Sequence, residues 1–369
     1  MPEQFPTLPM VDLRPALRAA GPAIRARLSE MQAAGQYILG PQVARFEAEF
    51  AEATGARSSV GVGSGTGALQ LALRTALHER AGEVVVPALT SLFTAQAALA
   101  AGGRLTIADV DEDSLLLTAD TAETACGPAT AAIIAVHLYG RPCQLKKLAR
   151  LARERKAALI QDACQAHGAR HLDHPLTDYS PFVCYSFYPT KNLGCLGDGG
   201  AVATGSAKVD GSIRLRRDGG RRGGQVAAVR AINERLDEMH ACYLRALLPG
   251  LARANQHRAE VAARYDEALS GCSGVRLLAR TDESVHHLYV IRAKNREKLR
   301  AHLLAAGIQT GIHYPVPLHR HPAFRDARVP APLPVAERAC KEILSLPIGV
   351  HIRLSDAERV AACIRRFYE

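Results

Sequence analysis

The chain has 369 residues, of which 48% are hydrophobic and 22% are charged. This composition supports a large hydrophobic core and predicts two domains. The formal net charge of +10 permits an anionic partner but identifies none. No stretch approaches the roughly 20 apolar residues of a membrane span, and the N-terminus lacks the basic and apolar run of a signal peptide. We therefore expect a cytoplasmic protein with no membrane contact.

The nine cysteines are odd in number, and no two of them have CxxC spacing. Reduced thiols are expected in place of disulfides, and the spacing does not indicate a zinc site. We expect no metal centre.

Short apolar runs alternate with helical patterns from about residue 40 to residue 205. Six of these runs are predicted strands: residues 83–88, 104–111, 131–140, 157–163, 182–187 and 200–205. They are apolar without alternation, as strands are when both faces are buried. The spacing predicts an α/β fold with a mostly parallel sheet covered by helices, in which ligands gather at the carboxyl ends of the strands.

The pattern changes after about residue 245, so we divide the chain into a large α/β domain, residues 1–245, and a smaller C-terminal α+β domain, residues 246–369. The smaller domain is predicted to begin with a long helix that is interrupted near Pro249–Gly250. Its other predicted elements are a strand at residues 286–292 and helices at residues 295–306, 334–344 and 355–367. The last helix is expected to open with a capping box formed by Ser355 and Glu358.

A Gly-Ser-Gly-Thr sequence, residues 63–66, immediately precedes an amphipathic helical pattern. The free N–H groups and the dipole at a helix start favour an anion, and glycines let that anion approach the backbone. A phosphate is therefore a natural ligand for this stretch. Simple helix capping is the alternative, because Gly, Ser and Thr are common at helix starts.

Two charged residues end neighbouring predicted strands. Asp162 closes a buried strand, where a carboxylate is costly unless it is paired. It either caps the following segment or is held ready for a buried cation, such as a protonated ring nitrogen. Lys191 lies one strand further on beside several glycines, where desolvation and a nearby cation would lower its pKa and let it trap a carbonyl. A phosphate-binding or exposed lysine is the alternative.

A phosphate cradle, a strand-end aspartate and a strand-end lysine, in this order, are what pyridoxal 5′-phosphate (PLP) needs. The cradle anchors the phosphate, the aspartate keeps the pyridinium nitrogen protonated, and the lysine forms a Schiff base. Ser186, five residues before Lys191, is placed to add a hydroxyl to the phosphate.

The sequence resembles the DegT/DnrJ/EryC1/StrS family of PLP-dependent nucleotide-sugar aminotransferases. The resemblance extends along nearly the whole chain and is most specific in SFYPTKNLGCLGDGG, which contains Lys191, and in HYPVPLH. It implies the type I PLP-dependent transferase fold of aspartate aminotransferase, with residues 1–245 as the PLP-binding domain.

By that resemblance, Lys191 is the Schiff-base lysine and the proton carrier of the transamination. The resemblance assigns the remaining cofactor contacts to Gly65, Thr66 and Ser186 at the phosphate, Asp162 at the pyridine nitrogen, Ala163 at the ring face and Gln165 at the phenolic oxygen. Asn233 matches an asparagine that reaches the phosphate of the neighbouring subunit, which implies an obligate homodimer with shared active sites. His313 and Tyr314 match a stretch that borders the sugar pocket; a structural role is the alternative for His313.

The sequence departs from the family pattern at two positions. Ser91 occupies the place of an aromatic residue that stacks on the cofactor ring, and Phe93 can substitute only if the backbone shifts. Ala231 stands near a position that is often glycine.

A basic segment, residues 214–225, carries five arginines within residues 214–222. It is expected to be a flexible solvated loop, with contact to a diphosphate as the alternative. Nucleic-acid binding is not expected, because the segment lacks interleaved aromatic residues and any recognised binding motif. His286 and His287, which precede a predicted strand, are expected to be structural.

The resemblance implies that L-glutamate donates the amino group, that pyridoxamine phosphate carries it, and that a keto-sugar nucleotide accepts it. The most specific motifs resemble members that aminate C3 of a dTDP- or UDP-linked 3-keto sugar. A 4-keto sugar or a cyclitol ketone of the scyllo-inosose type is the alternative acceptor. A pyridoxamine-phosphate-dependent sugar dehydratase is disfavoured because such members replace the Schiff-base lysine. A non-catalytic regulator is disfavoured because Lys191 and Asp162 are both present.

Overall fold

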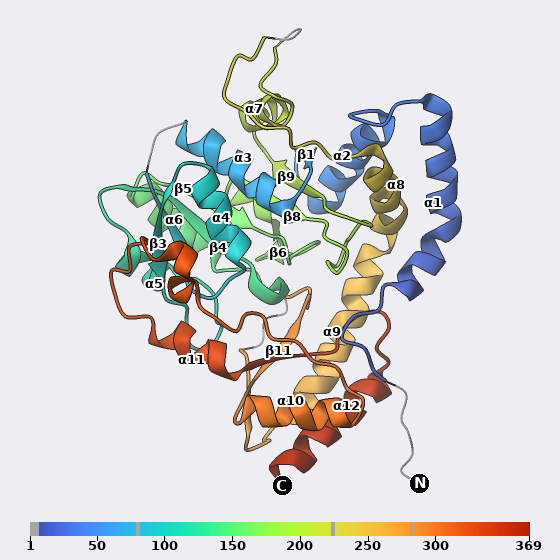
Figure 1. Ribbon diagram of the computed structural model, residues 1–369, viewed down its shortest axis with the longest axis vertical. Helices are drawn as coiled ribbons and strands as arrows, with labels where there is room; N and C mark the ends of the chain where they lie inside the picture. The colour runs from blue at the N-terminus through green and yellow to red at the C-terminus, as the bar shows by residue number, and fades with distance from the viewer. Residues whose placement is uncertain (1–6, 79–81, 223–225, 280, 282) are drawn as a thin grey trace.

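The computed structural model describes residues 7–78, 82–222, 226–279, 281 and 283–369, and its centre is a seven-stranded sheet (Figure 1). The strand order is β1-β9-β8-β5-β4-β2-β3. The strands are β1 (Ser58–Val62), β2 (Glu83–Pro87), β3 (Arg104–Ala108), β4 (Thr130–Val136), β5 (Ala158–Asp162), β8 (Val183–Ser186) and β9 (Gly200–Thr204). All pairs are parallel except the two that β9 makes with β8 and β1. The predicted mostly parallel sheet is therefore confirmed, and β1 is a strand that the sequence patterns did not indicate.

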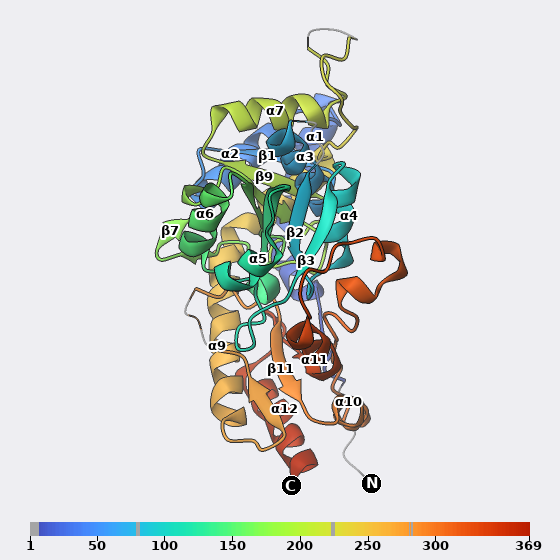
Figure 2. The same cartoon turned by 90° about the vertical axis from the view of Figure 1, so that its left-hand side faces the viewer.

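Helices cover both faces of this sheet. They are α3 (Gly65–Leu77), α4 (Leu92–Ala100), α5 (Ala119–Ala125) and α6 (Leu145–Glu154). Helix α3 packs on α4, and α5 packs on α6; Figure 2 shows α4 and α6 on opposite sides of the strands. Because both faces are covered, the strands are buried along nearly their whole length, as their uninterrupted apolar sequences predict.

Four further helices close one end of the sheet: α1 (Arg14–Ala34), α2 (Pro41–Thr54), α7 (Ala207–Arg217) and α8 (Glu238–Leu247). Helix α8 packs against both α1 and α2. The buried carboxylate of Glu238 accepts hydrogen bonds from the backbone N–H groups of Gln42 at 2.8 Å and Val43 at 2.7 Å. A carboxylate at a helix start satisfies N–H groups that have no partner within the helix. Glu238 therefore fixes the start of α2 from a position far along the chain.

The C-terminal part contains a three-stranded antiparallel sheet of order β10-β11-β12. Its elements are α9 (Leu251–Leu269), β10 (Val275–Leu277), β11 (Tyr289–Ala293), α10 (Arg296–Ala305), α11 (Pro334–Glu342), β12 (Ile343–Leu346) and α12 (Leu354–Tyr368). Helix α9 packs on α12 and β10, and Figure 2 shows it beside β11. The remaining elements are short: β6 (Arg170–His171), β7 (His174–Pro175) and the 3-10 helices Leu138–Gly140, Leu176–Asp178, Leu248–Gly250, Leu318–Arg320 and Pro322–Phe324.

Two predicted details of this part are wrong. The helix expected at residues 334–344 ends at Glu342, because Ile343–Leu346 pairs with β11 as a buried strand. Helix α12 begins at Leu354, so Ser355 is not its cap and does not form the expected box with Glu358. The carboxylate of Asp356 instead accepts the backbone N–H of Arg353 at 2.9 Å and forms an ion pair with the Arg353 guanidinium.

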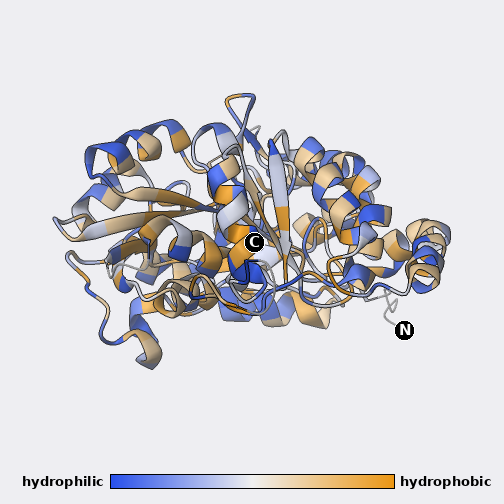
Figure 3. Cartoon of the chain, turned by 90° about the horizontal axis from the view of Figure 1, so that it is seen from above, coloured by the Kyte–Doolittle hydropathy of each residue, from blue (hydrophilic) through white to orange (hydrophobic). Residues whose placement is uncertain are grey.

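Two hydrophobic cores fill the molecule. The larger core surrounds the seven-stranded sheet and also takes in Leu318 and Phe324. The smaller core lies between the three-stranded sheet and helices α9, α10 and α12, and it includes Leu8 from the N-terminal segment. Figure 3 shows hydrophilic residues, in blue, on the helices outside these cores. The domain boundary at residues 245–246 stays a prediction.

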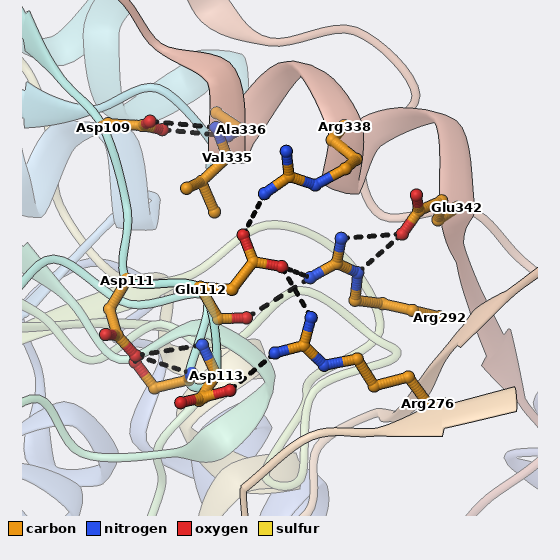
Figure 4. Close-up of polar contacts among 11 residues, drawn as sticks. Asp109, Asp111, Glu112, Asp113, Arg276, Arg292, Val335, Ala336, Arg338 and Glu342 are labelled. Atoms are coloured by element: carbon orange, nitrogen blue, oxygen red, sulfur yellow. Dashed lines mark hydrogen bonds and ion pairs between the residues drawn. The ribbon is translucent and has the colours of Figure 1, made fainter.

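An acidic segment after β3 connects the two sheets (Figure 4). Glu112 accepts hydrogen bonds from Arg292 on β11, Arg338 on α11 and Arg276 on β10. Asp109, nearby, accepts the N–H groups of residues 335 and 336 in the first turn of α11 at 3.0 and 2.8 Å. The carboxylates of this segment thus pair with arginines and with helix-start N–H groups of the C-terminal part.

No helix among the described residues is long and apolar enough to span a bilayer. All nine cysteines are free thiols. Within the described ranges, no group of three or more His, Cys, Asp or Glu side chains is arranged to hold a metal ion.

Candidate functional site

A cavity of about 860 Å³ lies at the carboxyl ends of the parallel strands. The predicted site residues that line it are Gly65, Thr66, Asp162, Gln165, Ser186, Lys191, His313 and Tyr314. Ala163 is fully buried behind this wall, and Asn233 is exposed outside the cavity. A larger hollow of about 1060 Å³ lies over β10, β11 and the start of α10, and no predicted site residue lines it. The chemistry is therefore assigned to the cavity at the strand ends.

The start of α3 forms one wall of this cavity. Ser64 caps the helix, since its hydroxyl accepts the backbone N–H of Gly67 at 2.9 Å and donates to Glu234 Oε1 at 2.7 Å. A Cβ on Gly65 would lie 2.6 Å from Cβ of Ser186 and 2.9 Å from Sγ of Cys164, so only glycine fits. The absent side chain lets Ser186 and Cys164 pack directly against the helix start, whose free N–H groups favour an anion.

Asp162 ends β5 and is buried in the cavity wall. Its Oδ2 accepts the hydroxyl of Thr94, on α4, at 2.8 Å, and its Oδ1 accepts the backbone N–H of Cys164 at 3.2 Å. These two bonds fix the carboxylate plane and leave further acceptor capacity on both oxygens. The sequence patterns did not indicate Thr94; no signal in the sequence pairs α4 with the end of β5.

Lys191 follows β8 in a loop whose backbone is held by a hydrogen bond from the Lys191 N–H to the Tyr188 carbonyl at 2.9 Å. Burial lowers the pKa of its amine, and the charges of Cys164 and Asp162 offset part of that effect. No cation among the described residues adds to the lowering, so the expected contribution of a neighbouring cation to the pKa is absent. A lysine with a lowered pKa is neutral more often at a given pH and is a better nucleophile and base.

Gln165 and Tyr139 tie the segment of His313 and Tyr314 to the large sheet. The Gln165 Oε1 accepts the backbone N–H of Tyr139 at 2.6 Å, and its Nε2 donates to the Tyr314 hydroxyl at 3.3 Å. The Tyr139 hydroxyl donates to the carbonyl of His313 at 2.5 Å. Burial raises the pKa of Tyr314 to about 12, so this hydroxyl keeps its proton.

His313 is held from its other side by Ser345 of β12, whose hydroxyl lies 2.8 Å from Nδ1. Burial, followed by the charge of Lys191, lowers the pKa of His313. Tyr139 and Ser345 both support the predicted sugar-side residues from distant parts of the chain. Only the resemblance of their surrounding motifs, VHLYGRP and ILSLPI, could have directed attention to them.

Two buried histidines stand behind the cavity. His137 Nδ1 accepts the backbone N–H of Cys143 at 3.0 Å, and its Nε2 faces the side-chain oxygen of Gln161 at 3.1 Å. His167 Nε2 lies 2.8 Å from the Ser186 carbonyl. Burial lowers the pKa of His137 to about 4 and that of His167 to about 3, and the charge of Lys191 contributes to the second shift. Both rings are therefore neutral near pH 7.

Comparison with known proteins assigns this chain to a family. The sequence model of the DegT/DnrJ/EryC1/StrS aminotransferase family matches residues 19–365. The chain belongs to the DegT/DnrJ/EryC1/StrS aminotransferase family. The family predicted from the sequence motifs is thereby confirmed, and so is the aminotransferase activity class.

Two relatives of this chain are similar to it over nearly their full length. The chain is 39% identical to dTDP-3-amino-3,4,6-trideoxy-alpha-D-glucose transaminase of Streptomyces venezuelae, over 99% of this chain and 97% of that protein. It is 36% identical to UDP-N-acetyl-3-dehydro-alpha-D-glucosamine 3-aminotransferase of Acidithiobacillus ferrooxidans, over 98% of each. The crystal structure of DesV from S. venezuelae superposes with a TM-score of 0.94 at 38% identity, covering 99% of both chains. This structural match confirms the predicted fold.

Ser91 occupies the position that the resemblance predicts to be a ring-stacking residue. Ser91 caps α4, and its hydroxyl accepts the backbone N–H of Phe93 at 3.4 Å. Phe93 lines the cavity but is 59% exposed, so its ring lies at the cavity edge.

The basic segment is partly helical, so the expectation of a loop is wrong for residues 214–217, which end α7. Arg214 and Arg217 both form ion pairs with the buried carboxylate of Glu47, and Arg217 also donates to the Gly61 carbonyl at 2.7 Å. The ion pairs explain why a sequence rich in arginine is structured here. Arg221 is paired with Asp218 at the surface, and residues 223–225 lie outside the described residues.

Proposed function

We propose that this protein is a PLP-dependent aminotransferase that transfers the amino group of L-glutamate to C3 of a dTDP- or UDP-linked 3-keto sugar. The observation that carries the proposal is the convergence of Gly65, Asp162 and Lys191 on one cavity at the strand ends. The two relatives described above are named for dTDP-3-amino and UDP-3-dehydro sugars. Their names support an acceptor with a ketone at C3.

The residues of the cavity fit the cofactor. Its volume, about 860 Å³, is in the range of cofactor and ligand sites. The helix start at Gly65 and Thr66, with Ser186 packed directly against it, suits a phosphate. The Asp162 carboxylate has acceptor capacity for a protonated ring nitrogen. When bound, PLP supplies an electron sink that stabilises negative charge on the carbon bearing the amine.

In this proposal, each protein group has a defined task. The Asp162 carboxylate holds a proton on the ring nitrogen, and Thr94 keeps that carboxylate oriented. The Lys191 amine would take the proton from the donor's reacting carbon and return it to the carbon on the other side of the transferred nitrogen. Its lowered pKa increases the neutral fraction that can accept the proton.

The segment of His313 and Tyr314 is proposed to hold the sugar. Tyr314 presents a protonated hydroxyl, and His313 presents a largely neutral ring because its pKa is lowered. Both can exchange hydrogen bonds with sugar hydroxyls without placing a charge beside the reacting carbon. Their ties to Tyr139 and Ser345 keep the segment in place.

We also propose that the enzyme acts in the cytoplasm as a homodimer with shared sites. Exposed apolar side chains, including Phe93 at 59%, Tyr188 at 52% and Val11 at 42%, line the cavity, so its rim is left partly uncovered by its own chain. Asn233 is exposed and outside this cavity, where a second subunit could receive it. Nine free thiols are compatible with a reducing compartment.

The proposal is tested by absorbance spectroscopy of the purified protein with PLP. We expect a visible band from lysine-bound cofactor that L-glutamate bleaches and a 3-keto-sugar nucleotide restores. Lys191→Ala should lack the band, whereas Lys146→Ala, on the exposed face of α6, should keep it.

A panel of acceptors tests the position of amination. Restoration by a 4-keto sugar or a cyclitol ketone, but by no 3-keto sugar, would overturn the preference for C3. Absence of the band in the wild-type protein would overturn the aminotransferase mechanism and favour the regulator alternative.

A further inference from the structure

Arg258, on α9, lines the cavity without an acidic partner. Its hydrogen bonds to the described residues all come from Nη1 and are long: 3.3 Å to the carbonyls of His286 and His287 and 3.4 Å to that of Ile348. Nε is buried and has no hydrogen-bond partner among the described residues. No described carboxylate lies within ion-pair distance of this guanidinium, in contrast to Arg214, Arg217 and Arg292 in the same chain.

An unpaired guanidinium in the cavity wall has an unfavourable free energy of desolvation. Removing a guanidinium from water carries a penalty of several kcal/mol, which carbonyl dipoles at long distance offset only in part. Burial alone lowers the pKa of Arg258, to about 10, so the group is still charged near pH 7. A charge held in a cavity wall without its counterion is suited to an anionic ligand that supplies one.

Arg258 is held in a fixed relation to Lys191. Asn255, one helical turn earlier on α9, accepts a hydrogen bond from Asn192 Nδ2 at 2.8 Å, and Asn192 directly follows Lys191. The Asn192 side-chain oxygen lies 3.1 Å from Nδ1 of His287. The pKa of His287 is lowered by burial first, then by the charges of Lys191 and Arg258. His287, expected to be structural, thus lies in the cavity wall and is linked to Asn192 by its ring and to Arg258 by its carbonyl.

We propose that Arg258 binds a carboxylate of the amino donor while Lys191 acts on the neighbouring carbon. This inference rests on the proposed function and adds the donor subsite to it. A guanidinium matches a carboxylate with two parallel hydrogen bonds, which fixes orientation as well as position. The cofactor phosphate has its own cradle at Gly65 and Ser186, so it does not need Arg258.

The donor is favoured over the diphosphate of the nucleotide sugar because hydrogen bonds tie the helix that carries Arg258 to the loop that carries Lys191. These hydrogen bonds are those of the network of Asn192, Asn255 and His287. A diphosphate sits several bonds away from a sugar C3, whereas an amino acid carries its α-carboxylate on the reacting carbon itself.

The test separates the two half reactions of the PLP-loaded enzyme. In Arg258→Gln, we expect the glutamate concentration for half-maximal bleaching to rise about 100-fold, as for loss of one partner of a desolvated ion pair. Restoration of the band by the keto-sugar nucleotide, starting from the pyridoxamine form, should stay within about threefold. Arg258→Lys should recover only part of the loss, because an ammonium group cannot form the paired hydrogen bonds.

Arg253→Gln is the matched control, since Arg253 lies on α9 but is exposed and does not line this cavity. It should leave both half reactions unchanged. Retention of the visible band and of the thermal unfolding midpoint shows that each variant is folded. Equilibrium binding of glutarate, an unreactive dicarboxylate, should weaken about 100-fold in Arg258→Gln by calorimetry, independently of turnover.

Different results identify different failures. If bleaching of Arg258→Gln requires no more glutamate than that of the wild-type protein, or if restoration by the nucleotide sugar is impaired equally, the donor subsite is wrong. The second result would instead assign Arg258 to the diphosphate. If the wild-type protein binds glutarate but shows no band with PLP, the proposed function fails while the carboxylate site stands. A loss seen with L-glutamate and L-glutamine alike assigns the bound group to the α-carboxylate, and a loss seen with glutamate alone assigns it to the side chain.

Discussion

The packing around Gly65 in the cavity wall leaves no space for a side chain. The space that its side chain would occupy is filled by Ser186 and Cys164, at 2.6 and 2.9 Å from the position of a Cβ. A methyl group here must displace backbone or side chains that also form the proposed phosphate cradle. The position therefore couples cofactor binding to stability.

Gly65→Ala is accordingly expected to weaken PLP binding at least about tenfold and to destabilise the fold by about 1–3 kcal/mol, the usual cost of overpacking. Titration of the apo-protein with PLP and chemical denaturation measure the two effects. Gly205→Ala is the control, because nothing lies within 4 Å of a Cβ at Gly205 and alanine should be tolerated there. Equal PLP affinity in the Gly65 variant and the wild-type protein would contradict the cradle.

The residues with predicted roles are those whose chemistry is unusual for their position in the sequence. Lys191 among glycines and Asp162 after an apolar run could be identified because a charge at a buried strand end is costly unless a partner compensates it. Thr94, Tyr139 and Arg258 could not, because a threonine, a tyrosine or an arginine on a helix or strand end has many ordinary uses. Their importance comes from partners distant in the chain, which only the fold brings together.

At the scale of elements, the segment after β3 joins the two sheets through Glu112. Burial raises the pKa of Glu112, but hydrogen bonds from Arg292 and Arg338 outweigh it, so the pKa is lower than the ordinary 4.5. Arg292 is itself buried, with 4% of its surface exposed, and depends on Glu112 and Glu342 for its counterions. The ionised form of Glu112 is therefore favoured by folding.

Glu112→Gln is expected to lower the free energy of unfolding at pH 7 by about 1–2 kcal/mol, more than for an isolated surface pair because three guanidinium groups lose their shared partner. A depressed folded-state pKa gives stability that is present above pH 4.5 and is lost as the pH falls through the lowered value. The difference between the variant and the wild-type protein should thus shrink on acidification. Denaturation at pH 7 and pH 4 measures it.

Glu297→Gln is the control for this effect, since Glu297 is 62% exposed and pairs with Arg296 at the surface. It should change stability by less than about 0.5 kcal/mol at either pH. A Glu112 variant whose deficit stays constant between pH 7 and pH 4 would show that the lost contact is not electrostatic.

Element types could be predicted where a periodic pattern extended over many residues. The predictions failed where a strand was short. Ile343–Leu346 follows a helix without a turn residue, and its apolar sequence also fits the last turn of that helix. Val275–Leu277 and Ser58–Val62 are only three and five residues long and depend on pairing with strands distant in sequence. Pairing energy of this kind is not visible in a local pattern.

At the scale of the whole molecule, the exposed position of Asn233 bears on how many chains make one active site. If Asn233 serves the neighbouring subunit, Lys191→Ala and Asn233→Asp chains should complement each other in a mixed dimer. One of its two sites would then have both residues intact, so about half of the wild-type activity is expected. Two affinity tags isolate the mixed dimer for this assay.

The reverse arrangement is the decisive control. A dimer of one wild-type chain with one chain carrying both substitutions should be nearly inactive if the sites are shared. If each site is built by one chain, this second dimer would keep about half of the activity and the first would have almost none. The two dimers contain the same substitutions, so differences in stability do not confuse the comparison.

The buried histidines behind the cavity do not change their charge near neutral pH. His137 and His167, with pKa values of about 4 and 3, gain no proton over the range in which most cellular enzymes work, and the pKa values of His287 and His313 are also lowered. Acidification from pH 8 to pH 6 therefore adds no charge at His137 or His167. A change in rate within that interval therefore belongs to other groups, such as the amine of Lys191, the ring of His313, the bound ligands or groups at the rim. His137 and His167 keep a constant charge between pH 6 and pH 8. The pH dependence of the rate in that range reports on proton transfer at other groups of the site.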